Sequence, residues 1–448
     1  MSSVSIEGRI YGKESAVTEV DNVRAILPLP SVLQVMDVLV QDILTNFLRR
    51  AFPPVPGTFI GARPHTQALD IAHGLQSVVE KALDDKSQGA VAQMDIKAYY
   101  DSLDTLLLCR WLEEHGVPKR ICATTLRLQL LPQVFLNSGA VRVLIALRTM
   151  GTLTGSRVAG ALGRIPVEST ICQRVAHWRS LGFQAGDHIL TICAYVDNIF
   201  SAGRNLGSAI SILEDFELQL LQNWGLTIKP SSRACMVPRG SLEEPANIEK
   251  WPLCATFTVL GHILADNGST SACWEYTRRA MWRAYFANSR KCANTHCALQ
   301  LLQRTVTPVF DYRNTRWPAY AELAQTIDRL QRKMVAGILR PRMQLGEAPD
   351  RYIRRRNRLA TVECLRMGTW SYRHCKRILN WRDHLERPAN AASWAAILLH
   401  FRGFEWLMAR RSQHQGGLLG GRTGTRVASG NVSTRWHDGV LYAEQRVG

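Results

Sequence analysis

A single aspartate, Asp197, lies at the centre of an otherwise apolar stretch, and this feature constrains the fold more than any other. The stretch reads HILTICAYVDNIFSAG over residues 188–203, and the apolar residues on both sides of Asp197 predict two short strands of a buried hairpin. A buried carboxylate costs several kcal/mol unless it is paired with a cation or binds a metal. Asp197 therefore needs partners elsewhere in the chain.

The charge of the chain points to a polyanionic partner. Its 448 residues include 55 Lys and Arg against 37 Asp and Glu, a net charge of +18. Such an excess favours nucleic acid as the partner, with anionic lipid as the alternative. No uncharged apolar run approaches the roughly 18 residues that span a bilayer, and residues 1–22 lack the apolar segment of a secretion signal. We therefore expect an intracellular protein without a membrane partner.

Eleven cysteines are scattered along the chain, and no two of them form a Cys-x-x-Cys pair. The nearest approach to a metal site is KCANTHC, with Cys292, His296 and Cys297, but a second ligand pair is missing. Reduced and largely buried thiols are the favoured interpretation.

The spacing of apolar residues predicts an α+β domain over roughly 90–265. The Pro- and Gly-rich residues 51–67 predict a loop within or before this domain. Predicted helices alternate with predicted strands; the helices cover residues 31–50, 68–79 and 207–224, and the strands cover residues 88–96, 188–196, 199–203, 225–237 and 255–264.

Beyond about residue 270 the pattern is helical almost throughout. Arginine becomes dense there, as in RYIRRRNR over residues 351–358, which indicates either a phosphate-binding surface or a solvated helix face. Residues 413–448 are Gly-rich and aperiodic at their start, and we expect them to form a flexible tail.

The best candidate partner for Asp197 is Asp95, which ends the apolar strand of VAQMDIKAYYDSLD. Two carboxylates at the tips of adjacent strands can hold two divalent cations about 4 Å apart, the arrangement that drives phosphoryl or nucleotidyl transfer. Mg²⁺ suits such a site because substrate phosphates and water complete its octahedron. The alternative for each carboxylate is a cap or a turn. Asp101, with Asp104 three residues later, is predicted to be a helix N-cap and therefore structural.

These residues carry a family resemblance. QMDIKAYYDSL resembles the first catalytic motif of reverse transcriptases, and AYVDNIFSAG resembles their Tyr-x-Asp-Asp hairpin. Five further segments are similar to other motifs of this family and follow in the same order; they lie at residues 23–40, 59–75, 151–165, 223–237 and 256–264. Residues 306–339 resemble the thumb-side region of non-LTR retrotransposon enzymes, so that the resemblance covers about 20–345 and extends to group II intron-like enzymes.

The resemblance implies a right-hand polymerase with fingers, a ferredoxin-like palm and a helical thumb. The palm would be an antiparallel sheet with helices on one face. The implied domains are an N-terminal segment, fingers and palm, a thumb-like region, an Arg-rich helical region and the tail, over residues 1–22, 23–265, 266–345, 346–412 and 413–448.

The resemblance also assigns a metal site. Asp95 and Asp197, with the carbonyl of Ile96, would bind two Mg²⁺ ions, for which Mn²⁺ can substitute, and Asn198 would complete the catalytic set. Asn198 stands where the family has a second aspartate, so the site has less negative charge than its relatives. Thr154 stands where the family has glutamine, and Ser232 or Arg233 where it often has lysine.

Four residues would contact the nucleotide. Tyr100 would close the 2′ side of the ribose and so select dNTPs; the alternative is a core tyrosine. Arg24 would neutralise the triphosphate, Arg63 would bind either the triphosphate or a template phosphate, and Gly155 would let the backbone approach the templating base pair.

The expected function is RNA-directed DNA synthesis, with an RNA template, a DNA primer and dNTPs as partners. A nuclear location follows from the way such relatives insert their copies. The substitution at Asn198 favours an alternative, a catalytically impaired protein that binds nucleic acid alone. A two-metal nuclease is a third possibility.

Overall fold

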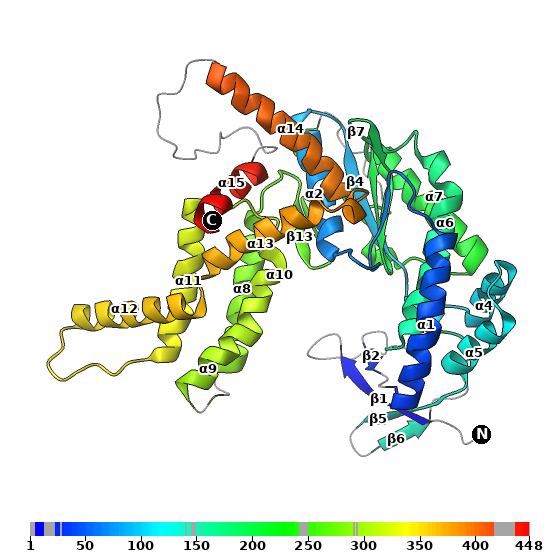
Figure 1. Cartoon of the computed structure of the whole chain (residues 1–448), viewed down its shortest axis with the longest axis horizontal. Helices are drawn as coiled ribbons and strands as arrows, with labels where there is room; N and C mark the ends of the chain where they lie inside the picture. Colours follow the sequence, from blue (N-terminus) through cyan, green and yellow to red (C-terminus); the bar gives the residue numbers. More distant parts are fainter. Residues whose placement is uncertain are drawn as a thin grey trace.

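The chain folds into a central sheet flanked by helices, with a long helical region at one end (Figure 1). The computed structural model describes residues 5–12, 23–26, 29–138, 141–144, 149–153, 155–241, 250–289, 292, 294–415 and 435–447.

The central sheet has five strands in the order β11 (Ala234–Met236), β4 (Ala90–Asp95), β10 (Asn198–Gly203), β9 (Ile192–Tyr195) and β3 (Thr58–Ile60). β4 pairs antiparallel with β10 and β11, and β9 and β10 form the hairpin that the sequence predicts around Asp197. β3 runs parallel to β9 at the edge of the sheet, within the segment that the sequence predicts to be a loop. The sheet places β4 and the hairpin at its centre.

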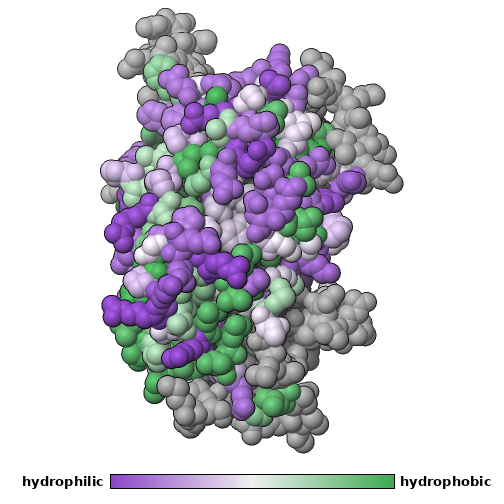
Figure 2. All heavy atoms as spheres, turned by 90° about the vertical axis from the view of Figure 1, so that its right-hand side faces the viewer, coloured by the Kyte–Doolittle hydropathy of each residue, from purple (hydrophilic) through white to green (hydrophobic). Residues whose placement is uncertain are grey.

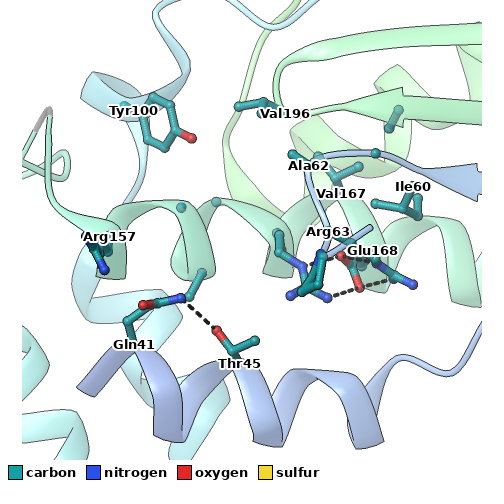
Figure 3. Close-up of a pocket in the computed structure, with 17 residues that line it drawn as sticks. Gln41, Thr45, Ile60, Ala62, Arg63, Tyr100, Arg157, Val167, Glu168 and Val196 are labelled. Atoms are coloured by element: carbon teal, nitrogen blue, oxygen red, sulfur yellow. Dashed lines mark hydrogen bonds and ion pairs between the residues drawn. The ribbon is translucent and has the colours of Figure 1, made fainter. Parts of the chain in front are cut away.

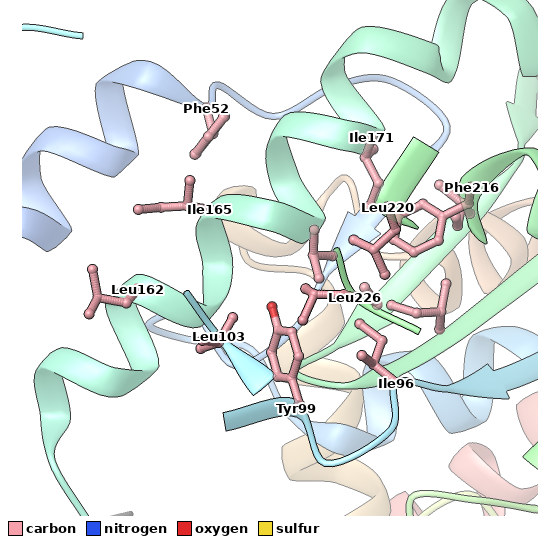
Figure 4. Packing of buried hydrophobic residues seen from close by; sticks show 14 of the residues in the cluster. Phe52, Ile96, Tyr99, Leu103, Leu162, Ile165, Ile171, Phe216, Leu220 and Leu226 are labelled. Carbon is pink, nitrogen blue, oxygen red and sulfur yellow. The ribbon is translucent and has the colours of Figure 1, made fainter. Parts of the chain in front are cut away.

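Helices cover both faces of this sheet. On one face, α6 (Arg157–Trp178) and α7 (Leu206–Trp224) bury Met94 and Ile199 together with Phe216 (Figure 4). On the other face, α2 (Ala68–Asp84) packs against the strand residues that alternate with Met94 and Ile199 along the chain, among them Phe200. The sequence prediction of helices on one face is therefore wrong. Both faces of the strands are apolar, and both need a cover.

Helix α14 (Trp394–Gln415) lies along α2 and adds a further layer (Figure 1). The two helices approach closely, since a Cβ on Gly74 would lie 2.7 Å from the Cβ of Trp394. The guanidinium of Arg402 forms an ion pair with Glu80 of α2. Burial raises the pKa of Glu80, and the Arg402 charge opposes that shift.

A second region lies beside the sheet and is held by α1 (Ser31–Ala51). Its other helices are α3 (Tyr99–Ser102), α4 (Thr105–Glu114) and α5 (Lys119–Leu130). A four-stranded sheet completes it, in the order β2 (Val23–Ile26), β1 (Ser5–Gly12), β5 (Gln133–Ser138) and β6 (Val141–Leu144).

A buried carboxylate joins α1 to α6. Asp37 accepts hydrogen bonds from the hydroxyl of Ser156 at 2.5 Å and from the main-chain N–H of Arg157 at 2.6 Å. Ser156 is itself the N-cap of α6. The negative charge therefore sits at the positive end of the α6 dipole, which fixes the two helices relative to each other.

The apolar composition of α1 would also allow it to cross a membrane. Among the described helices, it alone has the length and mean hydropathy (1.2) that a membrane span requires, whereas the sequence predicted none. One such helix is weak evidence, and Leu44 and Leu48 of α1 are buried in the protein core. Val32 and Leu39 of α1 are exposed. Figure 2, which shows the right-hand side of the view in Figure 1, has apolar side chains gathered on its lower half.

The remaining sheet elements are two hairpins. β7 (Phe183–Ala185) pairs with β8 (His188–Leu190), and β12 (Thr256–Val259) pairs with β13 (His262–Ala265). The sequence predicted one strand over 255–264, but the chain turns at Leu260 and Gly261, both of which have a positive φ. A short 3₁₀ helix, Pro230–Ser232, precedes β11.

The C-terminal part is helical, as the sequence predicts. Its elements are α8 (Ser271–Ser289), α9 (Thr295–Leu301), a π-helical turn (Leu302–Val306), α10 (Thr307–Asn314), α11 (Ala321–Leu339), α12 (Pro349–Met367), α13 (Trp370–Leu385), a 3₁₀ turn (Pro388–Asn390), α14 and α15 (Arg435–Val447). Helix α15 packs against α13 within the segment predicted to be a flexible tail, so the prediction is wrong for residues 435–447. Residues 416–434 lie outside the described part of the chain.

Candidate active site

The hairpin turn holds Asp197 in a fixed position. Asn198 pairs with Tyr195 across the two strands, so Val196 and Asp197 form the two-residue turn. Val196 has φ of +59°, a conformation that β-branched residues rarely adopt. A positive φ at the first of two turn residues is typical of a type II′ hairpin turn, where glycine is usual. The turn is thus strained at a valine, as is frequent at functional sites.

The structure brings Asp95 beside this turn. Asp95 is the cross-strand partner of Asn198, and the N–H of Ile96 donates a hydrogen bond to the carbonyl of Asp197 at 2.9 Å. On its other side, the N–H of Asp95 donates to the Ser232 hydroxyl at 2.8 Å. The two aspartates therefore lie close together at one end of the sheet, since each is next to the partner of the other across the two strands.

Asn198 acts on Asp197 through a hydrogen bond. Its side-chain nitrogen Nδ2 donates to Oδ1 of Asp197 at 2.9 Å. The amide therefore orients the Asp197 carboxylate and stabilises its negative charge, whereas an aspartate at this position would add a second negative charge.

Two tyrosines lie next to Asp197. Tyr99 is fully buried, and its hydroxyl donates to the carbonyl of Gly163. Tyr100 is half-buried; burial raises the pKa of its hydroxyl, and the charge of Asp197 raises it further. A Cβ on Gly163 would lie 3.3 Å from both rings, so α6 approaches them closely. Tyr100 packs in part against the core, as the alternative of a core tyrosine expects, and its ring also lines a cavity.

This cavity, of about 370 Å³, is here named the arginine cavity. Tyr100 and Val196 lie on one side of it, and Gln41 and Thr45 of α1 lie on the other (Figure 3). Three arginines line it, namely Arg63, Arg157 and Arg164.

A buried glutamate positions two of these arginines. Glu168 has a side chain only 1% exposed and accepts hydrogen bonds from Arg63, at 3.3 Å to Nε and 2.5 Å to Nη2. Arg164 donates to the same carboxylate through Nε at 2.6 Å. Since the lining holds three guanidiniums and one carboxylate, the cavity keeps a net positive charge. Its lining suits an anionic ligand.

Sequence reasoning found Arg63 but missed Arg157, Arg164 and Glu168. A signal exists in their spacing, because positions 157, 164 and 168 share one face of α6. That α6 faces Arg63 depends on tertiary packing, which spacing does not reveal.

Of the other predicted residues, those that the structure describes do not line the cavity. The backbone of Arg24 pairs with Tyr11 in the four-stranded sheet, and its side chain lies outside what the structure describes, as does Thr154. Gly155 is exposed with φ of +101°, immediately before the N-cap of α6, and is not among the residues that line the cavity. Arg233 forms an ion pair with Glu217 at 2.6 Å.

The prediction that Asp101 caps a helix is wrong. Asp101 lies inside α3 and is exposed, whereas Asp104 accepts from the N–H groups of Leu106 and Leu107 at 2.9 and 3.0 Å. The chain leaves the helical conformation at Leu103, so the next helix begins three residues later than the sequence suggests.

The oxygen-rich end of the sheet fits a magnesium site. Its donors are two carboxylates, Asp95 at the end of β4 and Asp197 in the turn beside it, and Mg²⁺ prefers such hard oxygen ligands. In the described part of the chain, no group of three or more His, Cys, Asp or Glu side chains could hold a metal ion. The Sγ atoms of Cys292 and Cys297 lie 3.1 Å apart, and all eleven cysteines are free, seven of them buried.

Comparison with known proteins gives distant structural likenesses. No family model and no curated protein matches the chain. It is similar to apo telomerase from Candida tropicalis, with 11% identity and a TM-score of 0.44 over 96% of this chain and 69% of that one. It is also similar to telomerase from Candida albicans in complex with a fragment of telomeric RNA, with 10% identity and a TM-score of 0.42 over 94% and 65%.

A telomerase from Candida tropicalis lacking its C-terminal domain is similar to 58% of this chain, at 12% identity and a TM-score of 0.38, and the chain covers 53% of it. The chain thus spans between about half and two thirds of the length of these structures. Likenesses of this size carry no functional conclusion.

Proposed function

We propose that this protein is an RNA-directed DNA polymerase, which extends a primer 3′-hydroxyl with dNTPs on an RNA template. The observation that carries the proposal is the pairing of Asp95 with the Asp197 hairpin beside a cavity lined by three arginines. A carboxylate pair suits Mg²⁺, and a positive cavity suits a triphosphate. The order of motifs further favours the polymerase part of a non-LTR retroelement.

Each residue of the site then has a role. Asp95 and Asp197, with the carbonyl of Ile96, would hold the two Mg²⁺ ions, which when bound supply charge neutralisation for nucleotidyl transfer. Arg157 and Arg164 would bind phosphate oxygens, and Arg63 would do so from the loop after β3.

The remaining contacts concern the sugar and the carboxylate geometry. Tyr100 would lie against the ribose and disfavour a 2′-hydroxyl, because its ring lines the cavity and is held against Gly163 of α6. Asn198 would hold the Asp197 carboxylate in place through its hydrogen bond.

Primer extension tests the proposal. With a poly(rA) template, an oligo(dT) primer and Mg²⁺ or Mn²⁺, the protein is expected to extend the primer, and Asp95→Ala and Asp197→Ala to reduce extension at least about a hundredfold. Asp101→Ala is the matched control, because Asp101 is exposed and does not line the cavity. Equal extension by all four proteins would refute the assigned site.

The hydrogen bond from Asn198 to Asp197 favours a second candidate, a protein that binds nucleic acid without copying it. With Asp197 held by an amide, the site has less negative charge for cations than two aspartates would give. Tight RNA binding without extension, in the presence of either metal, would support this candidate. Mg²⁺-dependent cleavage of RNA without dNTPs would instead indicate a nuclease.

A further inference from the structure

A second positively charged cavity lies between α11 and α12, and we name it the α11–α12 pocket. It has a volume of about 540 Å³. Five cationic side chains line it, together with a tyrosine and an asparagine: Arg329, Arg332, Lys333, Arg340, Arg356, Tyr352 and Asn357. No carboxylate is among its lining residues.

The five cations are not neutralised by the protein. Among the described residues, none of the five forms an ion pair with a carboxylate. The neighbouring Arg355 differs, because it donates to Glu347 at 2.8 and 2.7 Å. That pair lowers the pKa of Glu347 to about 2 and fastens the segment between the two helices. The carboxylate of Glu347 is thus engaged by Arg355 and forms no ion pair with the five cations of the pocket.

Helix stability does not explain the cluster. The negative end of the α11 dipole favours cations in its last turn, which accounts for Arg340 alone. Arg329 and Arg332 lie two turns or more before that end, and Arg356 comes from α12. Like charges in one pocket repel, so the arrangement costs stability unless an anion binds there.

An aromatic ring points to the chemistry of that anion. The guanidinium of Arg356 lies 5.9 Å from the centre of the Tyr352 ring, and that of Arg355 lies 5.8 Å from it. The Nε of Arg356 is buried without a hydrogen-bond partner in the described part of the chain. Flat guanidinium and aromatic groups stack on nucleobases while the other cations contact phosphates, as in proteins that bind single strands.

The pocket lies far from the candidate active site. Figure 1 places α12 at the edge of the molecule opposite to α1 and α4. None of its lining residues lines the arginine cavity. A strand held at the Asp197 hairpin would therefore need additional length to reach it.

We propose that the α11–α12 pocket binds the sugar–phosphate backbone of a single-stranded nucleic acid segment, outside the part held at the active site. The statement that this segment lies outside the part held at the active site rests on the proposed function. The binding of nucleic acid by the α11–α12 pocket does not rest on it. The pocket would extend the contact between the protein and its template strand. The protein would therefore bind long strands more tightly than short ones.

Binding of labelled single-stranded RNA to the full chain, without primer or dNTPs, tests this. A short strand and one several times longer are titrated at several salt concentrations. Arg329→Gln with Arg332→Gln is expected to weaken binding of the long strand about tenfold and to lower the salt slope by about 1 to 2, with little change for the short strand. Tyr352→Ala is expected to weaken it about tenfold at all salt concentrations.

Arg110→Gln with Arg120→Gln is the matched control, since it removes the same charge from exposed positions on α4 and α5. Equal losses in both double variants would overturn the proposal. So would displacement of the RNA by inorganic phosphate at low concentration, or equally tight binding of a polyglutamate peptide. Far-UV circular dichroism confirms that each variant folds. The binding assay does not depend on polymerisation. If the wild-type protein binds the long strand but fails in the separate primer-extension assay, the proposed function is refuted and the proposal for the α11–α12 pocket is not.

Discussion

The two arginine-lined cavities of this molecule differ in how their cations are held. In the arginine cavity, a buried Glu168 fixes Arg63 and Arg164 through paired hydrogen bonds. In the α11–α12 pocket, five cations surround an open space with no carboxylate among them. The first arrangement fixes the guanidiniums at set positions. Such fixed positions are needed to orient a small anion for reaction. The second leaves long side chains free to adapt, which suits a polymer whose phosphates pass in varied positions.

The largest expected effect tests whether Glu168 is the residue that makes the first cavity rigid. Glu168→Gln leaves two guanidiniums, 20% and 15% exposed, without their carboxylate. We expect the free energy of unfolding to fall by about 2 to 3 kcal/mol, measured by urea denaturation. Glu275→Gln, which breaks the exposed pair with Arg278, is the control and should change it by less than about 1 kcal/mol. Similar losses in both would mean that burial does not distinguish Glu168.

A second prediction separates the ligands of the two cavities. Arg157 lines the arginine cavity without contacting Glu168, so Arg157→Gln should remove one phosphate contact and little structure. The KM for dNTP is expected to rise about tenfold in steady-state primer extension, with RNA affinity unchanged. Arg120→Gln serves for comparison. A change in RNA affinity without a change in KM would assign both cavities to the polymer.

A third prediction concerns the charge at the hairpin. Asn198→Asp replaces a hydrogen-bond donor with a carboxylate beside Asp95 and Asp197. Without divalent cations the repulsion should lower the melting temperature, and Mg²⁺ should raise it more than in the wild type. Primer extension is expected to rise several-fold. Asn198→Ala, which removes the donor without adding charge, should show neither the larger Mg²⁺ effect nor the gain in extension.

The smallest expected effect is a pH dependence that separates stability from RNA binding. Burial, with the charges of Arg316 and Arg313, lowers the pKa of His262 to about 3, and burial lowers that of His374 to about 4. Both stay neutral in the folded chain but bind protons in the unfolded chain below about pH 6.5. Stability is therefore complete above pH 6.5 and falls as the pH drops toward the folded pKa values.

Between pH 6.5 and 5.5 each of these two histidines should lower the free energy of unfolding by about 1 kcal/mol, measured by urea denaturation. RNA binding at the α11–α12 pocket should not change, because Arg and Lys stay protonated over this range. His374→Gln should reduce the slope of stability against pH, and His296→Gln, at an exposed position, should not. An equal reduction by both would show that burial is not the cause.

Local patterns predicted the elements around the site well. The hairpin at Asp197 and the strand that ends at Asp95 follow from alternating or continuous apolar residues bounded by polar ones. Their pairing joins residues a hundred positions apart. The sequence suggested it by placing a carboxylate at the end of each apolar strand, and the family resemblance then favoured it. The orientation of Asn198 toward Asp197 depends on side-chain geometry at the turn, which no sequence pattern encodes.

Long-range contacts account for what the sequence did not reveal. Strand β1 lies in a polar segment and pairs in parallel with β5, more than a hundred residues later. Glu168 meets Arg63 across 105 positions, and sequence spacing gives no sign of this contact. Helix α15 follows a Gly-rich segment and is stabilised by packing on α13. In each case the partner, and not the local sequence, decides the structure.

The packing of α14 on α2 has a consequence for how this protein reaches its native state. Glu80 and Arg402 are 322 positions apart, and Gly74 meets Trp394 across a similar interval. During synthesis, the outer side of α2 stays uncovered until more than 300 further residues have been made. Apolar surface left open for that time attracts other chains, so chaperones that shield hydrophobic surface should raise the yield of soluble protein.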